Sequence, residues 1–336
     1  MTTDTLAAYS LLMAYSAIAV YAIAFVMYVL DLSRRTGSIP VAEASARAAV
    51  PAATTARAGG GTALLERVGS VTTRIAEGQA KSVNKATRFQ RTAFALMIIA
   101  WVVHVGAVVL RGIAADRGPW ANMYEFSLTG TAIIVGIFIV VNLWRDVKFL
   151  GAYITGFVVL MLGLAATNFY VAVAPTSPPL QSYWLYIHIS VAMLATGFYA
   201  VGGGLAIVQL LQQAREKGRL TRGRFLATFP SSATLEAMSS RLIIVGFAFW
   251  TFTLMAGAIW AYHAWGRYWG WDTKEVWTFI VWVIFAGYIH ARATRGWRGT
   301  RSAWLAIIGL AAVLFNFTIV NLFFHGLHAY SGLSTM

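Results

Sequence analysis

The side chains best suited to bind a metal in this chain are its six histidines, because imidazole nitrogen ligates zinc, copper and haem iron. They are His104, His188, His263, His290, His325 and His328. A zinc site would more often add Cys, Asp or Glu ligands, and no local motif with metal-ligand spacing is present. The sequence also contains no cysteine. Any thiol chemistry therefore has to come from a partner or a substrate.

A second chemically unusual feature is the tryptophan-rich segment WGRYWGWDTKEVW, residues 265–277. It holds five aromatic rings, two glycines and four charged residues between two strongly apolar stretches. Tryptophan favours the membrane–water boundary, since its ring is apolar and its N–H needs a polar partner. Rings at this density would also form a flat wall for a planar ligand. Two histidines on separate helices beside such a wall suit a haem with two axial imidazoles.

The elements that would position these residues are membrane-spanning helices. Hydrophobic residues make up 59% of the 336 residues, charged residues only 11%, and the mean hydropathy is +0.67. A helix needs roughly 17–25 largely apolar residues to cross a bilayer, and eight runs suit that role. We therefore expect an all-α polytopic membrane protein. The runs lie near residues 5–30, 92–110, 126–143, 149–171, 184–212, 242–262, 276–291 and 302–323.

The basic residues predict how these helices are oriented. If the N-terminus lies outside, four segments face the cytoplasm: residues 31–91, 144–148, 213–241 and 291–301. These segments hold 22 of the 26 Lys and Arg residues, and basic loops stay on the cytoplasmic side. We therefore expect both termini and the external loop 263–277 on the extracytoplasmic side. The formal charge of +14 then reflects topology, and we expect no nucleic-acid binding.

The same pattern divides the chain into three parts. Residues 1–30 form the first span, which we expect to be retained because it lacks a basic leading region and a cleavage site. Residues 31–91 are rich in Ala, Arg and Gly, and we expect a flexible basic cytoplasmic linker with a surface-lying helix around residues 63–76. Residues 92–336 would form a seven-helix membrane domain that carries the tryptophan-rich loop.

Three histidines take notable positions in this topology. His188 begins the fifth span and His328 follows the eighth, so both are expected at the outer face. His290 lies near the inner end of the seventh span, 19 residues after Trp271. In a helix this separation is ~28 Å, close to the full ~30 Å of a hydrocarbon core. Ionisable groups inside a membrane are costly and are usually functional.

The tryptophan-rich segment resembles the WWD signature of the haem-handling proteins of cytochrome c biogenesis. Its continuation is similar to the CcsA branch of that family, also called ResC and, in some bacteria, CcsB. The resemblance spans about residues 95–330, and Thr273 departs from the proline that the family usually has there. The matching positions are residues 265–272, Lys274, Glu275, Trp277, Trp282, Tyr288, His290, Arg292, Pro119, Asn122, Tyr124, Glu125, residues 180–184, His188 and residues 326–328.

This resemblance implies a membrane subunit of a system II cytochrome c synthase. Such a subunit carries haem b, presents it at the outer face of the bacterial cell membrane, and works with a ResB-type membrane partner as a haem lyase. There the haem vinyl groups are joined to the thiols of the Cys-x-x-Cys-His motif of apocytochrome c. A thiol-reducing thioredoxin-like protein would take part indirectly.

The resemblance also assigns residues. His188 and His328 match the external ligands of the haem iron, and His290 matches a transmembrane ligand whose second axial partner is expected on the ResB-type chain. The haem-binding signature itself matches Trp265, Tyr268, Trp269, Trp271 and Asp272.

Other residues have more ordinary interpretations. His104, in mid-span, is expected to pack or hydrogen-bond rather than to bind iron, and His263 and His325 lie outside the family pattern. Four cations could each meet a haem propionate through a charge-assisted bond, although contact with lipid headgroups is the more ordinary role for each. They are Arg111, Arg117, Arg267 and Lys274.

Two alternative functions stay open at this point. A CcmC-like or CcmF-like haem delivery protein of the other biogenesis system would load haem onto a covalent chaperone, but it would differ in span number and lack the Gly-Leu-His ending. A non-enzymatic membrane transporter or scaffold would use its tryptophans only as anchors. A Soret band on the purified protein would separate haem handling from scaffolding.

Overall fold

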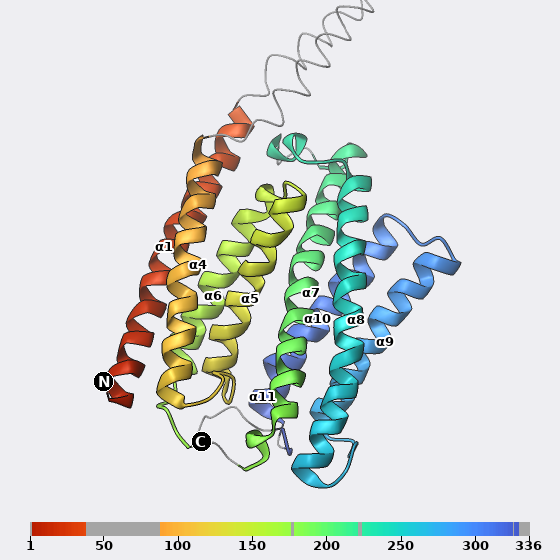
Figure 1. Ribbon diagram of the computed structural model, residues 1–336. Coiled ribbons are helices and arrows are strands. Elements are labelled where there is room, and N and C mark those ends of the chain that lie inside the picture. Colours follow the sequence, from red (N-terminus) through yellow and green to blue (C-terminus); the bar gives the residue numbers. More distant parts are fainter. Residues whose placement is uncertain (1, 38–87, 176–177, 221–223, 325, 329–336) are drawn as a thin grey trace, which may run out of the picture.

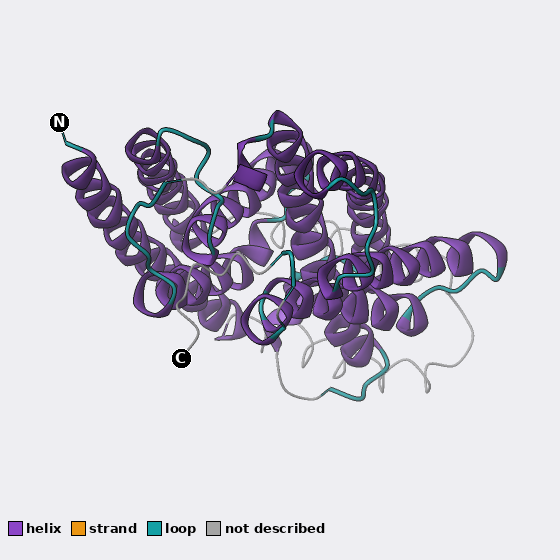
Figure 2. Cartoon of the chain, turned by 90° about the horizontal axis from the view of Figure 1, so that it is seen from below, coloured by secondary structure: helices purple, strands orange, loops and turns teal. Residues whose placement is uncertain are grey.

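The computed structural model describes residues 2–37, 88–175, 178–220, 224–324 and 326–328, and these ranges contain helices and no strand (Figures 1 and 2). Eight helical spans among them are long and apolar enough to cross a membrane. The prediction of an all-α polytopic membrane protein is thereby confirmed. The spans are α1 (Thr3–Gly37), α4 (Arg88–Ala115), α5 (Met123–Trp144), α6 (Gly151–Asn168), α7 (Tyr183–Glu216), α8 (Ser232–Trp265), α9 (Thr273–Thr294) and α10 (Thr300–Phe317), which is followed by α11 (Ile319–Phe323).

Several helices extend beyond the apolar runs at the end of the bundle that carries the basic loops. α1 continues to Gly37, α4 begins at Arg88, and α8 begins at Ser232. Hydropathy detects only the apolar part of a helix, so it underestimates helices whose ends are polar. The linker predicted over residues 31–91 is therefore helical at both of its ends. Its central part, residues 38–87, which includes the helix expected around 63–76, lies outside the described residues.

The helices pack around α7. α7 contacts α5, α8 and α10, while α1 pairs mainly with α4 and α6 (Figure 1). Three consecutive glycines of α7, at positions 202–204, each meet a different neighbour, because successive helical residues point about 100° apart. The first faces α8, the second Leu310 of α10, and the third Tyr153 of α6. Small residues let helices approach closely in a membrane, which is why α7 can join the two halves of the bundle.

The loops fall into two groups at opposite ends of the bundle. α1, α5, α7 and α9 end at the upper end of Figure 1, and the sequence segments that follow these four helices carry most of the basic residues. The connections that follow α4, α6 and α8 lie at the lower end, as does α11. α1 also begins at the lower end. The two ends therefore differ in charge as the sequence indicated, whereas the side of the membrane that each end faces stays a prediction.

Candidate functional site

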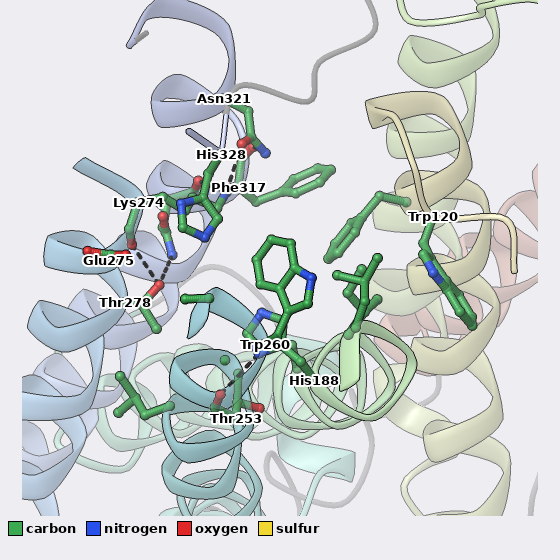
Figure 3. A pocket seen from close by; sticks show the side chains of 18 of the residues that line it. Trp120, His188, Thr253, Trp260, Lys274, Glu275, Thr278, Phe317, Asn321 and His328 are labelled. Carbon is green, nitrogen blue, oxygen red and sulfur yellow. Dashed lines mark hydrogen bonds between the residues drawn. The ribbon is translucent and has the colours of Figure 1, made fainter. Parts of the chain in front are cut away.

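A cavity lined by aromatic side chains opens at the lower end of the bundle, among α5, α7, α8, α9 and α10 (Figure 3). It contains about 1260 Å³ of empty space, including the part that is open to solvent. His188 and His328, which are far apart in the sequence, both line this aromatic cavity. Its other prominent lining residues are Trp120, Phe126, Trp260, Tyr268, Trp269, Phe317, Lys274, Glu275 and Asn321.

His188 is held by one of its two ring nitrogens. Its Nδ1 lies 3.0 Å from the carbonyl oxygen of Thr253 on α8. Because a carbonyl can only accept, Nδ1 must carry the proton, and Nε2 of the neutral ring keeps its lone pair. Among the described residues Nε2 has no hydrogen-bond partner. The ring also stacks on the indole of Trp260, with centroids 5.7 Å apart and an interplanar angle of 14°.

A glycine on α8 makes room for this imidazole. A Cβ at Gly257 would lie 2.7 Å from Cε1 and 2.8 Å from Nδ1 of His188. Any larger residue would therefore push the ring away from the carbonyl of Thr253. Sequence reasoning missed both Gly257 and Thr253, because their role depends on a contact between two helices.

His328 is held in the same way by a carboxylate. Its Nδ1 lies 2.6 Å from Oδ2 of Asp272, and its ring packs edge-on against Trp265 and Trp260. The hydrogen bond from His328 keeps the pKa of the Asp272 carboxyl below its usual value, so the carboxylate stays ionised. The stabilisation from this ionised carboxylate is present above the unfolded-state pKa and is lost as the pH falls through the folded-state pKa. Nε2 of His328 has no hydrogen-bond partner among the described residues.

Asp272 also begins α9, which fixes its position. It is the N-cap residue of a capping box in which the Glu275 carboxylate accepts hydrogen bonds from the N–H groups of Asp272, at 3.1 Å, and Gly270, at 2.8 Å. Thr273 follows as the first helical residue, a position where proline is well tolerated. The departure from the family's usual proline therefore leaves the start of α9 intact.

The predicted aromatic wall is only partly formed by the tryptophan-rich loop. Tyr268 and Trp269 line the aromatic cavity, whereas Trp265 packs behind His328. Trp271 is 76% exposed, and its backbone takes a left-handed φ of 60°. The most central ring is instead Trp260 of α8, which is 2% exposed and touches both imidazoles. Nothing in the local sequence distinguishes Trp260 from a helix residue that packs in the core.

The other histidines differ from this pair. His104 is fully buried and both of its nitrogens are engaged: Nε2 lies 2.8 Å from the carbonyl of Leu128 and Nδ1 lies 3.4 Å from the Tyr21 hydroxyl. This agrees with the expected packing role. His290 is exposed near the far end of α9, and His263 is exposed at the end of α8. His325 lies outside the described residues.

Two of the four cations considered above are already paired inside the protein. Nε of Arg111 lies 2.9 Å from Oε1 of Glu125, and Nη1 of Arg117 lies 2.6 Å from Oε2 of the same carboxylate. Arg111 and Glu125 are fully buried and Arg117 is 10% exposed. Contact with lipid headgroups, which we expected as the ordinary role, is therefore wrong for both arginines. The pairing instead fixes the turn before α5, from which Trp120 reaches the aromatic cavity.

We expect Gly326→Ala to damage the site through Asp272. A Cβ at Gly326 would overlap Oδ1 of Asp272, so the segment that carries His328 would move away from its carboxylate partner. Loss of such a supporting contact typically lowers metal affinity ~10–100-fold, and we expect a decrease in haem affinity of that size in Soret titrations. Gly287→Ala on α9 is the matched control, since a Cβ there meets nothing within 4 Å. Unchanged affinity in Gly326→Ala would contradict the supporting role of Asp272.

These features define a polytopic membrane protein that holds two imidazoles in an aromatic-lined cavity at one end of its bundle. Residues 120–328 match the sequence model of the family described as Cytochrome C assembly protein, and the chain belongs to that family. The matched region contains both His188 and His328, as well as His290.

Individual relatives support the CcsA branch. The cytochrome c biogenesis protein CcsA of Guillardia theta is 35% identical over 241 residues, which cover 67% of this chain and 80% of the relative. CcsA of Gloeobacter violaceus is 30% identical over 287 residues, 70% of this chain and 85% of the relative. The predicted resemblance to CcsA-type proteins is thus confirmed.

A solved structure has a related fold. The fold is similar to that of the cytochrome c haem lyase CcmF, with a TM-score of 0.60 and 17% sequence identity. The match covers 94% of this chain and 47% of that one, so this chain spans about half the length of CcmF. At this identity the likeness concerns the fold alone.

Proposed function

We propose that this protein is the CcsA-type subunit of a system II cytochrome c synthase, and that it binds haem b in the aromatic cavity before covalent attachment to apocytochrome c. The observation that carries the proposal is the pair of imidazoles in that cavity. Each of them, His188 and His328, has its Nδ1 held and its Nε2 free to bind iron. Membership of the cytochrome c assembly family supports haem as the metal-containing ligand.

The residues around the two imidazoles suit this role. A partner that accepts a hydrogen bond from the Nδ1–H group fixes the ring orientation of a ligating histidine and raises the basicity of its other nitrogen. The carbonyl of Thr253 acts in this way on His188, and the carboxylate of Asp272 acts on His328. Aromatic rings such as Trp260 and Trp269 provide apolar surface for a porphyrin. The thioether bonds form between haem vinyl groups and thiols of the apocytochrome, in keeping with a chain that has no cysteine.

We infer that the end with the aromatic cavity faces outward from the bacterial cell membrane. The support is the charge of the opposite end, whose connections carry most of the Lys and Arg residues. The external site would then meet apocytochrome c, and a thiol-reducing thioredoxin-like protein would act on that substrate rather than on this chain.

The second part of the proposal concerns His290. We propose that it belongs to a second haem-binding site near the cytoplasmic side, the inner station, which this chain forms together with a partner chain. His290 lies 17 residues after Thr273, or ~26 Å along α9 from the first residue of that helix. Its side chain is exposed, and α9 has the smallest buried share of the eight spans. We infer that a ResB-type subunit covers this face and donates the second axial imidazole.

Co-expression tests the function directly. Expressed alone, the full chain should show a weak Soret band and produce no holocytochrome c, because the inner station lacks its second ligand. With a ResB-type subunit, both the Soret absorbance and covalent haem on a Cys-x-x-Cys-His reporter should rise strongly. A purified complex without any Soret band would refute haem handling, and full cytochrome synthesis by this chain alone would refute the need for the partner.

A further inference from the structure

Lys274 is a cation enclosed in the wall of the aromatic cavity. Among the described residues that line the cavity, it is the only Lys or Arg (Figure 3). Its ammonium donates hydrogen bonds to the carbonyl of Asn316, at 2.8 Å, and to Oδ1 of Asn321, at 2.9 Å. Both acceptors are neutral. Contact with lipid headgroups, the ordinary role expected for this lysine, is therefore wrong, because its side chain points between α9 and α10.

The surroundings of this ammonium do not neutralise its charge. No described carboxylate forms an ion pair with Lys274, since Asp272 is bonded to His328, and Glu275 accepts two backbone N–H groups. Lys274 also lies in the first turn of α9, where the helix dipole disfavours a cation. A buried charge without a counter-charge is costly. Arg111 of α4 and Arg117 in the turn before α5, in contrast, share the carboxylate of Glu125.

The polar corner beside Lys274 has further unused hydrogen-bonding capacity. An ammonium has three N–H donors, and two of them are accounted for by the described acceptors. The third N–H therefore remains available to an acceptor, whereas Oδ1 of Asn316, which has no partner among the described residues, can itself only accept and would not bind an anion. The rest of the cavity wall is mainly apolar and aromatic, as Trp120 and Phe317 illustrate (Figure 3). A ligand that binds the third N–H of Lys274 would carry an anionic oxygen on one edge of an apolar body.

We propose that Lys274 is the specificity residue of the aromatic cavity and that it binds a carboxylate of the ligand, which for haem is one propionate. This inference rests on the proposed function. The ion pair would supply the missing counter-charge and would orient the porphyrin with a propionate edge toward α9 and α10. The cavity should then select haem as the free acid over haem whose propionates are esterified.

The test compares haem with haem dimethyl ester on the full chain purified with its ResB-type partner. Soret titrations should show that the wild-type protein binds the free acid at least about tenfold more tightly than the ester, since hydrogen bonds between charged groups are the strong ones. In Lys274→Met the two dissociation constants should converge. Lys274→Arg, which keeps the charge, should retain part of the preference. Lys217→Met is the matched control, because it makes the same replacement at an exposed lysine that does not line the cavity.

The outcomes separate this inference from the proposed function. A normal Soret band with equal affinity for acid and ester in the wild-type protein would overturn the role of Lys274 and leave haem binding intact. A Lys274→Met protein that keeps the wild-type Soret position and the full preference for the acid would also overturn the role of Lys274. No Soret band with either compound would overturn the proposed function itself. Convergence in Lys274→Met, with Lys217→Met unaffected, would establish the carboxylate contact.

Discussion

Replacing His188 or His328 by alanine should abolish cytochrome c maturation while leaving part of the bound haem in the complex. Either change removes one of the two axial nitrogens that we propose for the external haem site and leaves the proposed His290 station untouched. Loss of a supporting contact alone costs ~10–100-fold in metal affinity, and loss of a ligand should exceed that. The measurements are covalent haem on a reporter cytochrome and the Soret spectrum of the purified complex.

His263→Ala provides the matched control, because this imidazole is exposed at the same end of the bundle and does not line the aromatic cavity. It should mature cytochromes normally. Added imidazole should partly restore His188→Ala and His328→Ala, since it can occupy the vacant axial position. His290→Ala should instead lower total haem loading. Normal maturation by both His188→Ala and His328→Ala would end the assignment of the external site.

Replacing Glu125 by glutamine should strongly destabilise the protein. The carboxylate is fully buried, receives both Arg111 and Arg117, and also accepts the N–H of Ala121 at 3.0 Å. Glutamine keeps the shape but leaves two enclosed guanidinium groups without a counter-charge. Removing one partner of a buried ion pair costs about 3–5 kcal/mol. The mid-point of thermal unfolding in detergent should fall accordingly, together with haem affinity, because the turn that carries Trp120 loosens.

The pair of Asp146 and Lys148 offers the comparison for this prediction. Its side chains are 59% and 23% exposed, and exposed ion pairs contribute only about 0–1 kcal/mol. Asp146→Asn should therefore leave the unfolding transition almost unchanged. Removing Arg117 in addition to Glu125 should recover part of the lost stability, because one uncompensated charge then remains instead of two. Equal stability of Glu125→Gln and the wild-type protein would show that the arginines are neutralised by other means.

The sequence predicted the spans well, because bilayer thickness alone requires long apolar runs between basic loops. It also identified His188, His328 and the tryptophan-rich loop, since imidazoles at membrane boundaries and dense indoles are unusual locally. The conclusion that the two histidines share one cavity needed the structure, because they are held by different helices.

The missed features are contacts between distant segments. Gly257 matters because His188 rests on it, and Gly326 matters because Asp272 approaches it. Trp260 looks like an ordinary apolar residue until the structure shows that both imidazoles contact its ring. Arg111 and Arg117 looked like membrane-surface cations in the sequence, because the carboxylate that neutralises them belongs to Glu125 on α5. Side-chain spacing within one segment carries none of this information.

The two imidazoles of the aromatic cavity are far apart in the family-matched region: His188 lies at the start of α7, and His328 lies in the segment after α11, where that region ends. A chain emerges from the ribosome in sequence order, and its parts fold as they appear. The half of the site on α7 and α8 therefore exists while α9, α10 and α11 are still being made. A pocket with one imidazole and no Asp272 carboxylate would hold iron weakly. On the proposed function, capture of haem would be delayed until insertion of the bundle is complete, which would protect an unfinished chain from a reactive cargo.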